Sequence, residues 1–297
     1  MANDTKPSQS PRSEQSLDDL KAFWTPERMK DAVPAPSRRP DAGVKRVRRE
    51  ITQPSEESQH RSPPQRPRRE PPIDDARATF SAVPVADAMV FPFSTVGKLF
   101  YTQNGMSYEA SAAVISGNTL LTAAHALFDF PNQQWAQNLL FAPAYWAGRT
   151  PLGTWGVSVS YTLPGYNTTG NDSFDVGMAT TTPQNIADIT GSLGLIVNQG
   201  WNGLVWQALG YPASPYPPYD GTQMWSLTGP STGLDPDGTI AVGMRSNFAE
   251  GASGGPWLLG GATANGLNSY GHPTSPNIEY SPYFDSAVWQ MFLDVRS

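Results

Sequence analysis

The chain of 297 residues contains no cysteine and no long apolar run. The absence of cysteine excludes a disulfide framework, so the compartment cannot be inferred from cysteine pairing. The first residues, MANDTKPSQSPRSEQ, lack the apolar core of a secretion signal. We expect no membrane-spanning segment, and the sequence leaves the location open between the cytoplasm and secretion without a recognisable signal.

Basic residues are scarce over most of the chain. Residues 81–297 hold only 4 of the 20 Lys and Arg, but 13 of the 26 Asp and Glu. This part contains no cluster typical of a metal site, no glycine loop that would bind phosphate before a helix, and no basic patch. We therefore expect no metal and no cofactor, no nucleic-acid or membrane partner, and a monomeric protein.

Residues 1–85 differ in composition from the rest of the chain. They are rich in Pro, Ser, Gln and Arg and have few apolar residues to bury, which predicts a largely disordered extension. Basic and acidic residues are interspersed in it, which favours a solvated tail or linker over a nucleic-acid-binding arm. One island, SLDDLKAFWTPERMKDAV, predicts two short helices between residues 16 and 33, with Ser16 and Thr25 as N-caps. The pair Phe23–Trp24 would then need a surface to dock on.

From about Val83 the chain consists of short apolar runs between Gly, Pro and other turn residues, such as VGKLFYT, SAAVISG, TLLTAAHAL and GTIAVGM. This pattern predicts an all-β fold, a sandwich or a barrel. The last segment differs, because its apolar residues follow a helical period. These residues are Phe284, Val288, Met291, Phe292 and Val295. A C-terminal helix packed on a β-domain is expected.

A single serine lies among glycines in FAEGASGGPWLL, at position 253. Gly-Ser-Gly-Gly is also ordinary turn chemistry, so the stretch alone does not identify a nucleophile. A nucleophilic serine needs a base for its proton, an acid to orient that base, and donors for the oxyanion.

The base can be searched for among only three histidines. His60 lies in the extension and His272 in a Pro/Gly loop, whereas His125 follows an apolar strand-like run that ends in small residues, NTLLTAAHALF. This context favours His125 as the base, with a buried structural histidine as the alternative.

The orienting acid has two candidates in the stretch NDSFDVGMATT. Asp175 lies between Phe174 and Val176 and should be buried, and a buried carboxylate needs a partner to stay charged. Asp172 reads as a turn residue. Asp175 is the better candidate, with a strand-edge cap as its structural alternative.

The order of the three residues separates two folds. GASGG formally matches the nucleophile elbow of α/β-hydrolases, in which acid and histidine follow the serine, but only His272 follows Ser253 and no βαβ periodicity exists. The order His125, Asp175, Ser253 is instead that of chymotrypsin-like β-barrel proteases.

The segments LLTAAHAL, DVGMAT and GASGGP resemble the three signature segments of the chymotrypsin/trypsin-like serine protease clan. The finer similarity is to bacterial-type trypsin-like and V8-like (glutamyl endopeptidase-like) peptidases, which often carry segments like FWTPERM, GTW and GYPA…YDG. The resemblance covers roughly residues 92–297, together with the upstream island that contains FWTPERM. It implies two packed antiparallel β-barrels, over residues 86–190 and 191–297, with the C-terminal helix in the second.

The resemblance also implies roles for individual residues in hydrolysis of peptide bonds through an acyl-enzyme. Ser253 would be the nucleophile, His125 the general base and Asp175 the orienting carboxylate. The backbone N–H groups of Gly251 and Ser253 would form the oxyanion hole. A side chain at Gly251 would obstruct the turn or the substrate carbonyl.

The chain also departs from the family pattern. The positions of a disulfide near the histidine hold Ala110 and Ala126, which are small enough to pack as a pair. Animal trypsin-like enzymes have Asp where this chain has Ala252, and that Asp receives a newly freed N-terminus. Activation by that switch is therefore excluded.

The resemblance also points to positions that would determine which substrate residue is bound. The resemblance places Asn247 at the base of the pocket for the residue that precedes the cleaved bond, and its lack of charge disfavours cleavage after Lys or Arg. The V8-like histidine that binds Glu corresponds to Asn268, with His272 four positions on, so Glu specificity is left open. Ser269–Gly271 should pair with substrate backbone as an added strand, with Tyr270 as a platform.

Three further hypotheses remain open at this point. The extension could regulate the enzyme, either by docking through Phe23–Trp24 or by being trimmed as a pro-region in its Arg-rich stretch, or it could be a dispensable linker. The protein could also be an inactive protease fold that serves as a binding or scaffold module. A structural protein in which the glycine segment is only a turn would leave the ordered motifs as coincidence.

Overall fold

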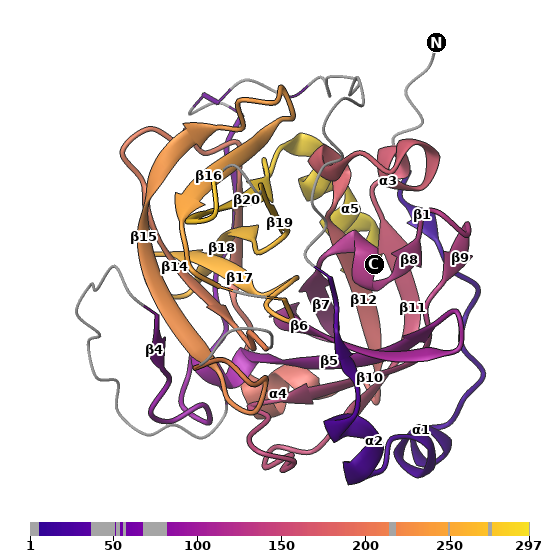
Figure 1. Ribbon diagram of the computed structural model, residues 1–297. Helices are drawn as coiled ribbons and strands as arrows, with labels where there is room; N and C mark the ends of the chain where they lie inside the picture. The colour runs from indigo at the N-terminus through magenta and orange to yellow at the C-terminus, as the bar shows by residue number, and fades with distance from the viewer. Residues whose placement is uncertain are drawn as a thin grey trace.

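The computed structural model describes residues 6–36, 51, 54–55, 58–67, 82–213, 218–248, 250–272 and 275–296. Within these ranges the chain forms two large β-sheets that lie side by side, the first built mainly from strands between residues 96 and 182 and the second mainly from strands between residues 194 and 282 (Figure 1). The predicted all-β, chymotrypsin-like architecture with a C-terminal helix is therefore confirmed. No helix in the described ranges is both long and apolar enough to cross a membrane.

The first sheet has eight strands in the order β1-β11-β10-β5-β6-β7-β12, with β2 beside β6. A further pairing between β11 and β12 closes six of these strands into an antiparallel barrel. The strands are β1 (Ser8–Gln9), β2 (Val33–Pro34), β5 (Val96–Gln103), β6 (Met106–Ser116), β7 (Thr119–Thr122), β10 (Gln137–Pro143), β11 (Trp155–Thr162) and β12 (Gly177–Thr182). A small hairpin, β8 (Phe128–Asp129) with β9 (Gln134–Trp135), lies apart from this sheet.

The second sheet has ten strands in the order β19-β20-β16-β15-β14-β17-β18-β13-β3, with β4 beside β15. Its pairings are antiparallel except for β13 with β18. The strands are β3 (His60–Ser62), β4 (Val83–Pro84), β13 (Gly194–Val197), β14 (Val205–Gly210), β15 (Trp225–Leu234), β16 (Ala241–Arg245), β17 (Pro256–Leu259), β18 (Thr263–Leu267), β19 (Tyr270–Gly271) and β20 (Ile278–Pro282).

Helices are short and lie outside the sheets. They are α1 (Leu17–Phe23), α2 (Pro26–Lys30), α3 (Pro164–Thr169), α4 (Ile186–Thr190) and α5 (Ser286–Arg296), with 3-10 turns η1 (Phe93–Thr95), η2 (Ala124–Ala126) and η3 (Asp172–Phe174). Helix α5 buries Val288, Met291, Phe292 and Val295, as the helical period predicts. Phe284 is buried but precedes the helix, because Asp285 Oδ1 accepts the backbone N–H of Ala287 at 3.0 Å and begins α5 after it.

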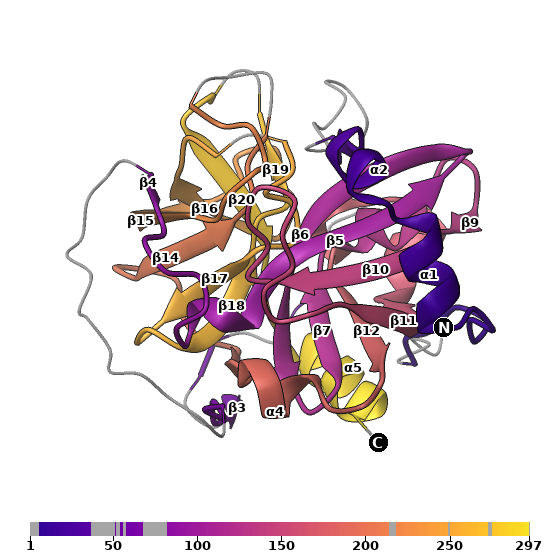
Figure 2. The same ribbon diagram turned by 90° about the horizontal axis from the view of Figure 1, so that it is seen from below.

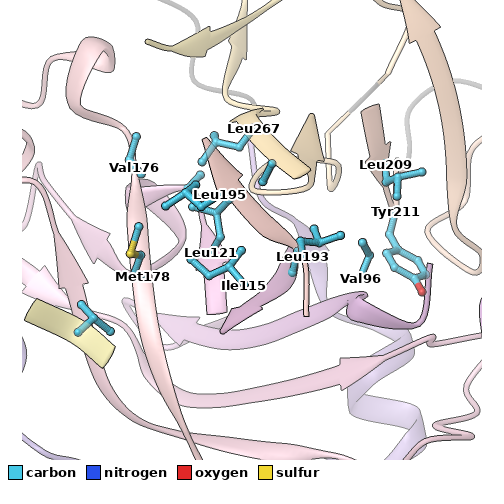
Figure 3. Close-up of a cluster of buried hydrophobic side chains, with 14 of the residues drawn as sticks. Val96, Ile115, Leu121, Val176, Met178, Leu193, Leu195, Leu209, Tyr211 and Leu267 are labelled. Carbon is cyan, nitrogen blue, oxygen red and sulfur yellow. The ribbon is translucent and has the colours of Figure 1, made fainter. Parts of the chain in front are cut away.

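The hydrophobic core follows from the two-residue period of the strands. On β6, Ala110, Ala112 and Val114 belong to a cluster that the first sheet forms with residues of η2 and α4, whereas Ala113 and Ile115 point to the other side. That other side meets the second sheet: Figure 3 shows Ile115, Leu121 and Val96 beside Leu193, Leu195 and Leu209. The two sheets thus share one apolar layer, and this layer fixes the strand ends of one relative to the other.

The described residues before position 86 are part of the folded protein. Strands β1 and β2 join the first sheet, and β3 and β4 join the second. Helices α1 and α2 have Ser16 and Thr25 as N-caps, and Figure 2 shows them along the first sheet beside β5 and β10. Trp24 is buried, and its Nε1 donates to the backbone carbonyl of Asn138 at 2.6 Å.

The pair Phe23–Trp24 thus has a docking surface within the same chain. The two rings pack edge to face with centroids 5.3 Å apart, and Trp24 also contacts Phe100 of β5 at 5.4 Å. The Arg-rich residues 37–50, in which trimming is hypothesised, lie outside the described residues.

Candidate active site

His125 is held at the point where β7 leaves the first barrel. The chain passes from β7 through Ala123 into η2, and the alanines on both sides of His125 are fully buried, so their small size lets the backbone turn tightly there. The His125 side chain keeps about 10% of its surface exposed. Its backbone carbonyl accepts a hydrogen bond from Gln103 Nε2 at 3.2 Å.

Asp175 lies next to His125 and is fully buried. Its Oδ1 accepts the backbone N–H of His125 at 2.8 Å, and its Oδ2 lies 2.8 Å from His125 Nδ1 and accepts from Ser269 Oγ at 2.6 Å. Because a carboxylate only accepts, Nδ1 carries a hydrogen, and in the neutral ring Nε2 is left as an acceptor. Asp172 lies in η3 and takes no part in this pairing.

Ser253 lies in the loop that connects β16 with β17, and three nearby positions, 251, 254 and 255, must be glycine. Gly251 and Gly254 have φ of 93° and 85°, in the region that disfavours side chains. A Cβ on Gly251 would lie 2.7 Å from the carbonyl oxygen of Tyr211. A Cβ on Gly255 would lie 2.0 Å from the carbonyl oxygen of Leu209. The glycines are therefore required by packing and by backbone conformation.

Ser111 on β6 of the first barrel hydrogen-bonds to the loop around Ser253, called the serine loop below, which belongs to the second sheet. Its backbone N–H donates to the Ser253 carbonyl at 2.8 Å, and its hydroxyl donates to the Gly251 carbonyl at 2.9 Å. The same hydroxyl accepts the backbone N–H of Tyr211 at 2.9 Å. Nothing in the sequence around Ser111 indicates this role, because the role depends on which strand meets the loop.

Asn268 also hydrogen-bonds to the serine loop, through the carbonyl of Ala252. It is fully buried, and its side-chain amide donates to the carbonyls of Leu209 at 3.0 Å and Ala252 at 3.1 Å. Its Oδ1 accepts from Trp257 Nε1 at 2.6 Å. With these bonds made, Asn268 has a structural role and does not face a substrate side chain.

The serine loop packs directly against the residues that precede His125. A Cβ on Gly254 would lie 2.2 Å from Thr122 Oγ1 and 2.8 Å from the backbone nitrogen of Ala123. Ser253 Oγ and His125 Nε2 are both buried, and neither has a hydrogen-bond partner among the described residues. The structure therefore brings His125 and Asp175 into contact and places Ser253 in the loop that adjoins them.

The two candidate oxyanion donors have different surroundings. The Glu250 carbonyl accepts the backbone N–H of Ala213 at 2.6 Å, which fixes the peptide before Gly251. The Gly251 N–H points to the carbonyl of Ala35, at 3.4 Å. The Ser253 N–H has no backbone partner among the described residues. A segment of the chain's own N-terminal region thus lies at one of the two donors.

The residues expected to bind substrate backbone form an edge strand. Strand β19 pairs only with β20, so its other edge has no neighbouring strand within the described part of the chain. Ser269 and Tyr270 are buried, and the Tyr270 hydroxyl donates to Asp235 Oδ2 at 2.6 Å. The Tyr270 ring therefore packs in the interior, whereas Gly271 is half-buried.

Both ring nitrogens of His272 lie close to carboxylate oxygens. Its Nε2 lies 3.0 Å from Asp235 Oδ1, and its Nδ1 lies 3.5 Å from Asp237 Oδ2. The three side chains place potential ligand atoms within 4.8 Å of one another, a spacing that could hold a metal ion. Because both ring nitrogens already face carboxylates, His272 is poorly placed to receive a glutamate side chain.

The positions that depart from the family pattern are tightly packed. Ala110 and Ala126 are both fully buried in the same hydrophobic cluster of the first barrel. Ala252 is fully buried as well.

Relatives of this chain are found among proteins of known structure. A scan of protein-family models and a search of curated proteins found no match. Among solved structures, a thermostable serine protease AL20 from an extremophilic microorganism is 30% identical over 69% of this chain and 98% of its own, with a TM-score of 0.63. The protease Anisep from Arthrobacter nicotinovorans is 30% identical over 68% and 95%, with a TM-score of 0.62.

A Glu endopeptidase is similar in fold at 18% identity, over 74% of this chain and 98% of its own, with a TM-score of 0.62. The closed barrel of the first sheet and the two relatives at 30% identity support the same assignment. The chain belongs to the chymotrypsin/trypsin-like clan of serine proteases.

Proposed function

We propose that the chain is a serine endopeptidase that uses His125, Asp175 and Ser253. The observation that carries this proposal is a buried His125–Asp175 pair, 2.8 Å apart, whose other ring nitrogen and the nearby Ser253 hydroxyl have no partner among the described residues. Leaving a buried polar atom unpaired costs about 1–3 kcal/mol. A site in which substrate binding brings this hydroxyl and this ring nitrogen into hydrogen-bond contact explains why the fold retains both.

In the proposed reaction Ser253 Oγ attacks the substrate carbonyl carbon while His125 Nε2 takes the hydroxyl proton. Asp175 holds Nδ1–H and stabilises the imidazolium that forms. His125 then gives the proton to the leaving amine, the peptide bond breaks, and the acyl group remains on Ser253. Water, deprotonated by His125, hydrolyses this acyl-enzyme. The N–H groups of Gly251 and Ser253 would stabilise the oxyanion in both steps, each worth about 3–4 kcal/mol.

Hydrolysis of a peptide mixture randomised around the scissile bond tests this function directly. We expect the full chain to cleave the mixture and to lose this activity after treatment with a sulfonyl fluoride, which modifies activated serines. A folded protein that cleaves no peptide would favour the inactive scaffold. Cleavage that resists the sulfonyl fluoride would exclude the serine mechanism.

We propose further that residues 33–35 occupy part of the substrate site, next to the candidate oxyanion donor Gly251. Strand β2 runs parallel to β6 beside Tyr108 and Glu109, and the backbone N–H of Ala35 donates to the Glu109 carbonyl at 2.7 Å. The Ala35 carbonyl accepts from Gly251 N–H at 3.4 Å, and Ala35 is fully buried. A substrate carbonyl would compete with Ala35 for this donor, so the segment would act as a built-in competitor.

Ala35→Pro is expected to speed peptide hydrolysis about fivefold. Proline has no N–H, so the bond to Glu109 is lost and the segment is released, and one such bond is worth about 1 kcal/mol. The initial rate of hydrolysis at low substrate measures the effect. Val33→Ala serves as the matched control, because Val33 is 42% exposed and the substitution keeps every backbone bond. An Ala35→Pro rate equal to that of the control would contradict competition by this segment.

A further inference from the structure

Glu279 is an acidic side chain on β20 that has no role in the chemistry proposed above. It is half-buried, and its Cα lies opposite Gly271 of β19 and Met244 of β16. Ser246 Oγ donates to its Oε2 at 2.9 Å. No Lys, Arg or His in the described part of the chain forms an ion pair with it. A partly desolvated carboxylate without a cation is costly, which calls for a ligand or a function.

The strand register shows which face of the sheet Glu279 occupies. Directly opposite residues share a face, and successive residues alternate. Glu279 therefore shares a face with Gly271, whereas Tyr280 shares the other face with Tyr270, on which it stacks at 5.3 Å. Ser246 lies on the Glu279 side, as its hydrogen bond requires.

Gly271 leaves room above this carboxylate. A Cβ there would meet only the Ile278 carbonyl oxygen, at 3.5 Å. Gly271 belongs to the edge strand β19, whose free edge is the expected partner of substrate backbone. The position opposite Glu279 on β19 therefore carries no side chain that would cover the carboxylate.

The groups around Glu279 begin the loop that carries the serine. Ser246 and Asn247 directly follow β16, and this loop leads to Ser253. Asn247 is hydrogen-bonded to Tyr219, whose ring packs edge to face against Phe248 at 6.3 Å. Aromatic rings and one carboxylate thus adjoin the start of the serine loop.

We propose that Glu279 receives the substrate side chain that precedes the cleaved bond, and that the protease therefore prefers Lys or Arg at this position. The inference rests on the proposed peptidase function. A cation would supply the partner that Glu279 lacks, and the neighbouring rings would cover its aliphatic stem. A Glu side chain at the same place would meet a like charge. Asn247, the position from which the sequence argues against Lys and Arg, contributes only a polar amide.

The surroundings of Glu279 predict a pH dependence. Burial raises the pKa of Glu279 to about 7, and the Ser246 hydrogen bond acts in the opposite direction. Burial and the Glu279 charge raise the pKa of Tyr219 to about 12, so this side chain stays neutral. The other ionisable groups nearby face away from Glu279. Arg245 lies with Ile278 on the opposite face of the sheet, and the ring nitrogens of His272 face Asp235 and Asp237. A bound cation favours ionised Glu279, so affinity for cations should rise as pH increases through about 7.

Binding of p-aminobenzamidine, an aromatic amidine about the size of an arginine head, tests the inference without requiring turnover. Its fluorescence is titrated with the full chain, with Glu279→Gln, and with Asp294→Asn, which removes one negative charge from α5. We expect Glu279→Gln to weaken binding at least about 30-fold and to abolish the rise with pH. Asp294→Asn should bind like the unchanged chain.

Equal binding by Glu279→Gln, or no binding by the unchanged chain, would overturn the inference. Cleavage of the randomised peptides separates this failure from failure of the proposed function. Serine-dependent cleavage without preference for Lys or Arg would support the proposed peptidase function but contradict the proposed role of Glu279. If the amidine binds in a way that depends on Glu279 but the chain cleaves no peptide, the cation site would be supported and the proposed peptidase function would be contradicted.

Discussion

Ser253→Ala is expected to lower kcat for peptide hydrolysis on the order of 10⁶-fold, the size seen when a triad nucleophile is removed. Alanine retains the Cβ and the backbone but has no atom that can form the acyl-enzyme. The remaining hydrolysis would come from substrate binding and the oxyanion donors alone.

The same substitution should leave the fold intact. The Ser253 hydroxyl makes no hydrogen bond with the described residues, while the bond from Ser111 N–H to the Ser253 carbonyl belongs to the backbone and is kept. Because an unpaired buried hydroxyl is costly to the folded state, removing it should leave the free energy of unfolding unchanged or raise it. Kinetics with the best peptide of the randomised mixture, together with thermal unfolding, measure both effects. Ser158→Ala on β11 is the matched control, and full activity of Ser253→Ala would refute the mechanism.

Asp175→Asn is expected to lower kcat about 10⁴-fold, as the equivalent change does in a related triad. The carboxylate accepts the His125 backbone N–H, the His125 ring N–H and the Ser269 hydroxyl. An amide has only one acceptor oxygen, so one of its two ends turns a donor toward His125. If the amide nitrogen faces Nδ1, the ring hydrogen moves to Nε2, and Nε2 no longer accepts the serine proton.

Asp172→Asn, three residues earlier in η3, is the matched control, because it makes the same chemical change outside the His125 pairing. Its kcat should stay within about threefold of the unchanged chain. The ratio of the two variants, at equal folded fraction by circular dichroism, isolates the contribution of Asp175. A small and equal loss in both variants would favour the strand-edge cap as the role of Asp175.

The fold class and the candidate triad could be predicted because their signals are local. Alternating apolar runs between turn residues indicate strands, and small residues around His125 and glycines around Ser253 are visible within a few positions. The helical period after residue 284 predicts α5 in the same way, although Asp285 sets its first residue.

The remaining contacts could not be predicted, because they depend on which strands meet. Nothing near Ser111 in the sequence indicates that it binds the Ser253 loop. Nothing indicates either that Ser269, whose backbone is expected to pair with substrate, also donates its hydroxyl to Asp175. The contact of Ala35 with Gly251 joins residues more than two hundred positions apart. Glu279 shows its position only through the register of β19 with β20.

Labelling of the full chain with a fluorophosphonate probe, followed by mass spectrometric identification of the modified peptide, tests the central claim most directly. The probe reacts with a serine only where a base activates it and an oxyanion site receives the phosphoryl oxygen. We predict one labelled residue, Ser253, with labelling that is lost in His125→Ala. A folded chain that stays unlabelled, or labelling at another serine, would contradict the account.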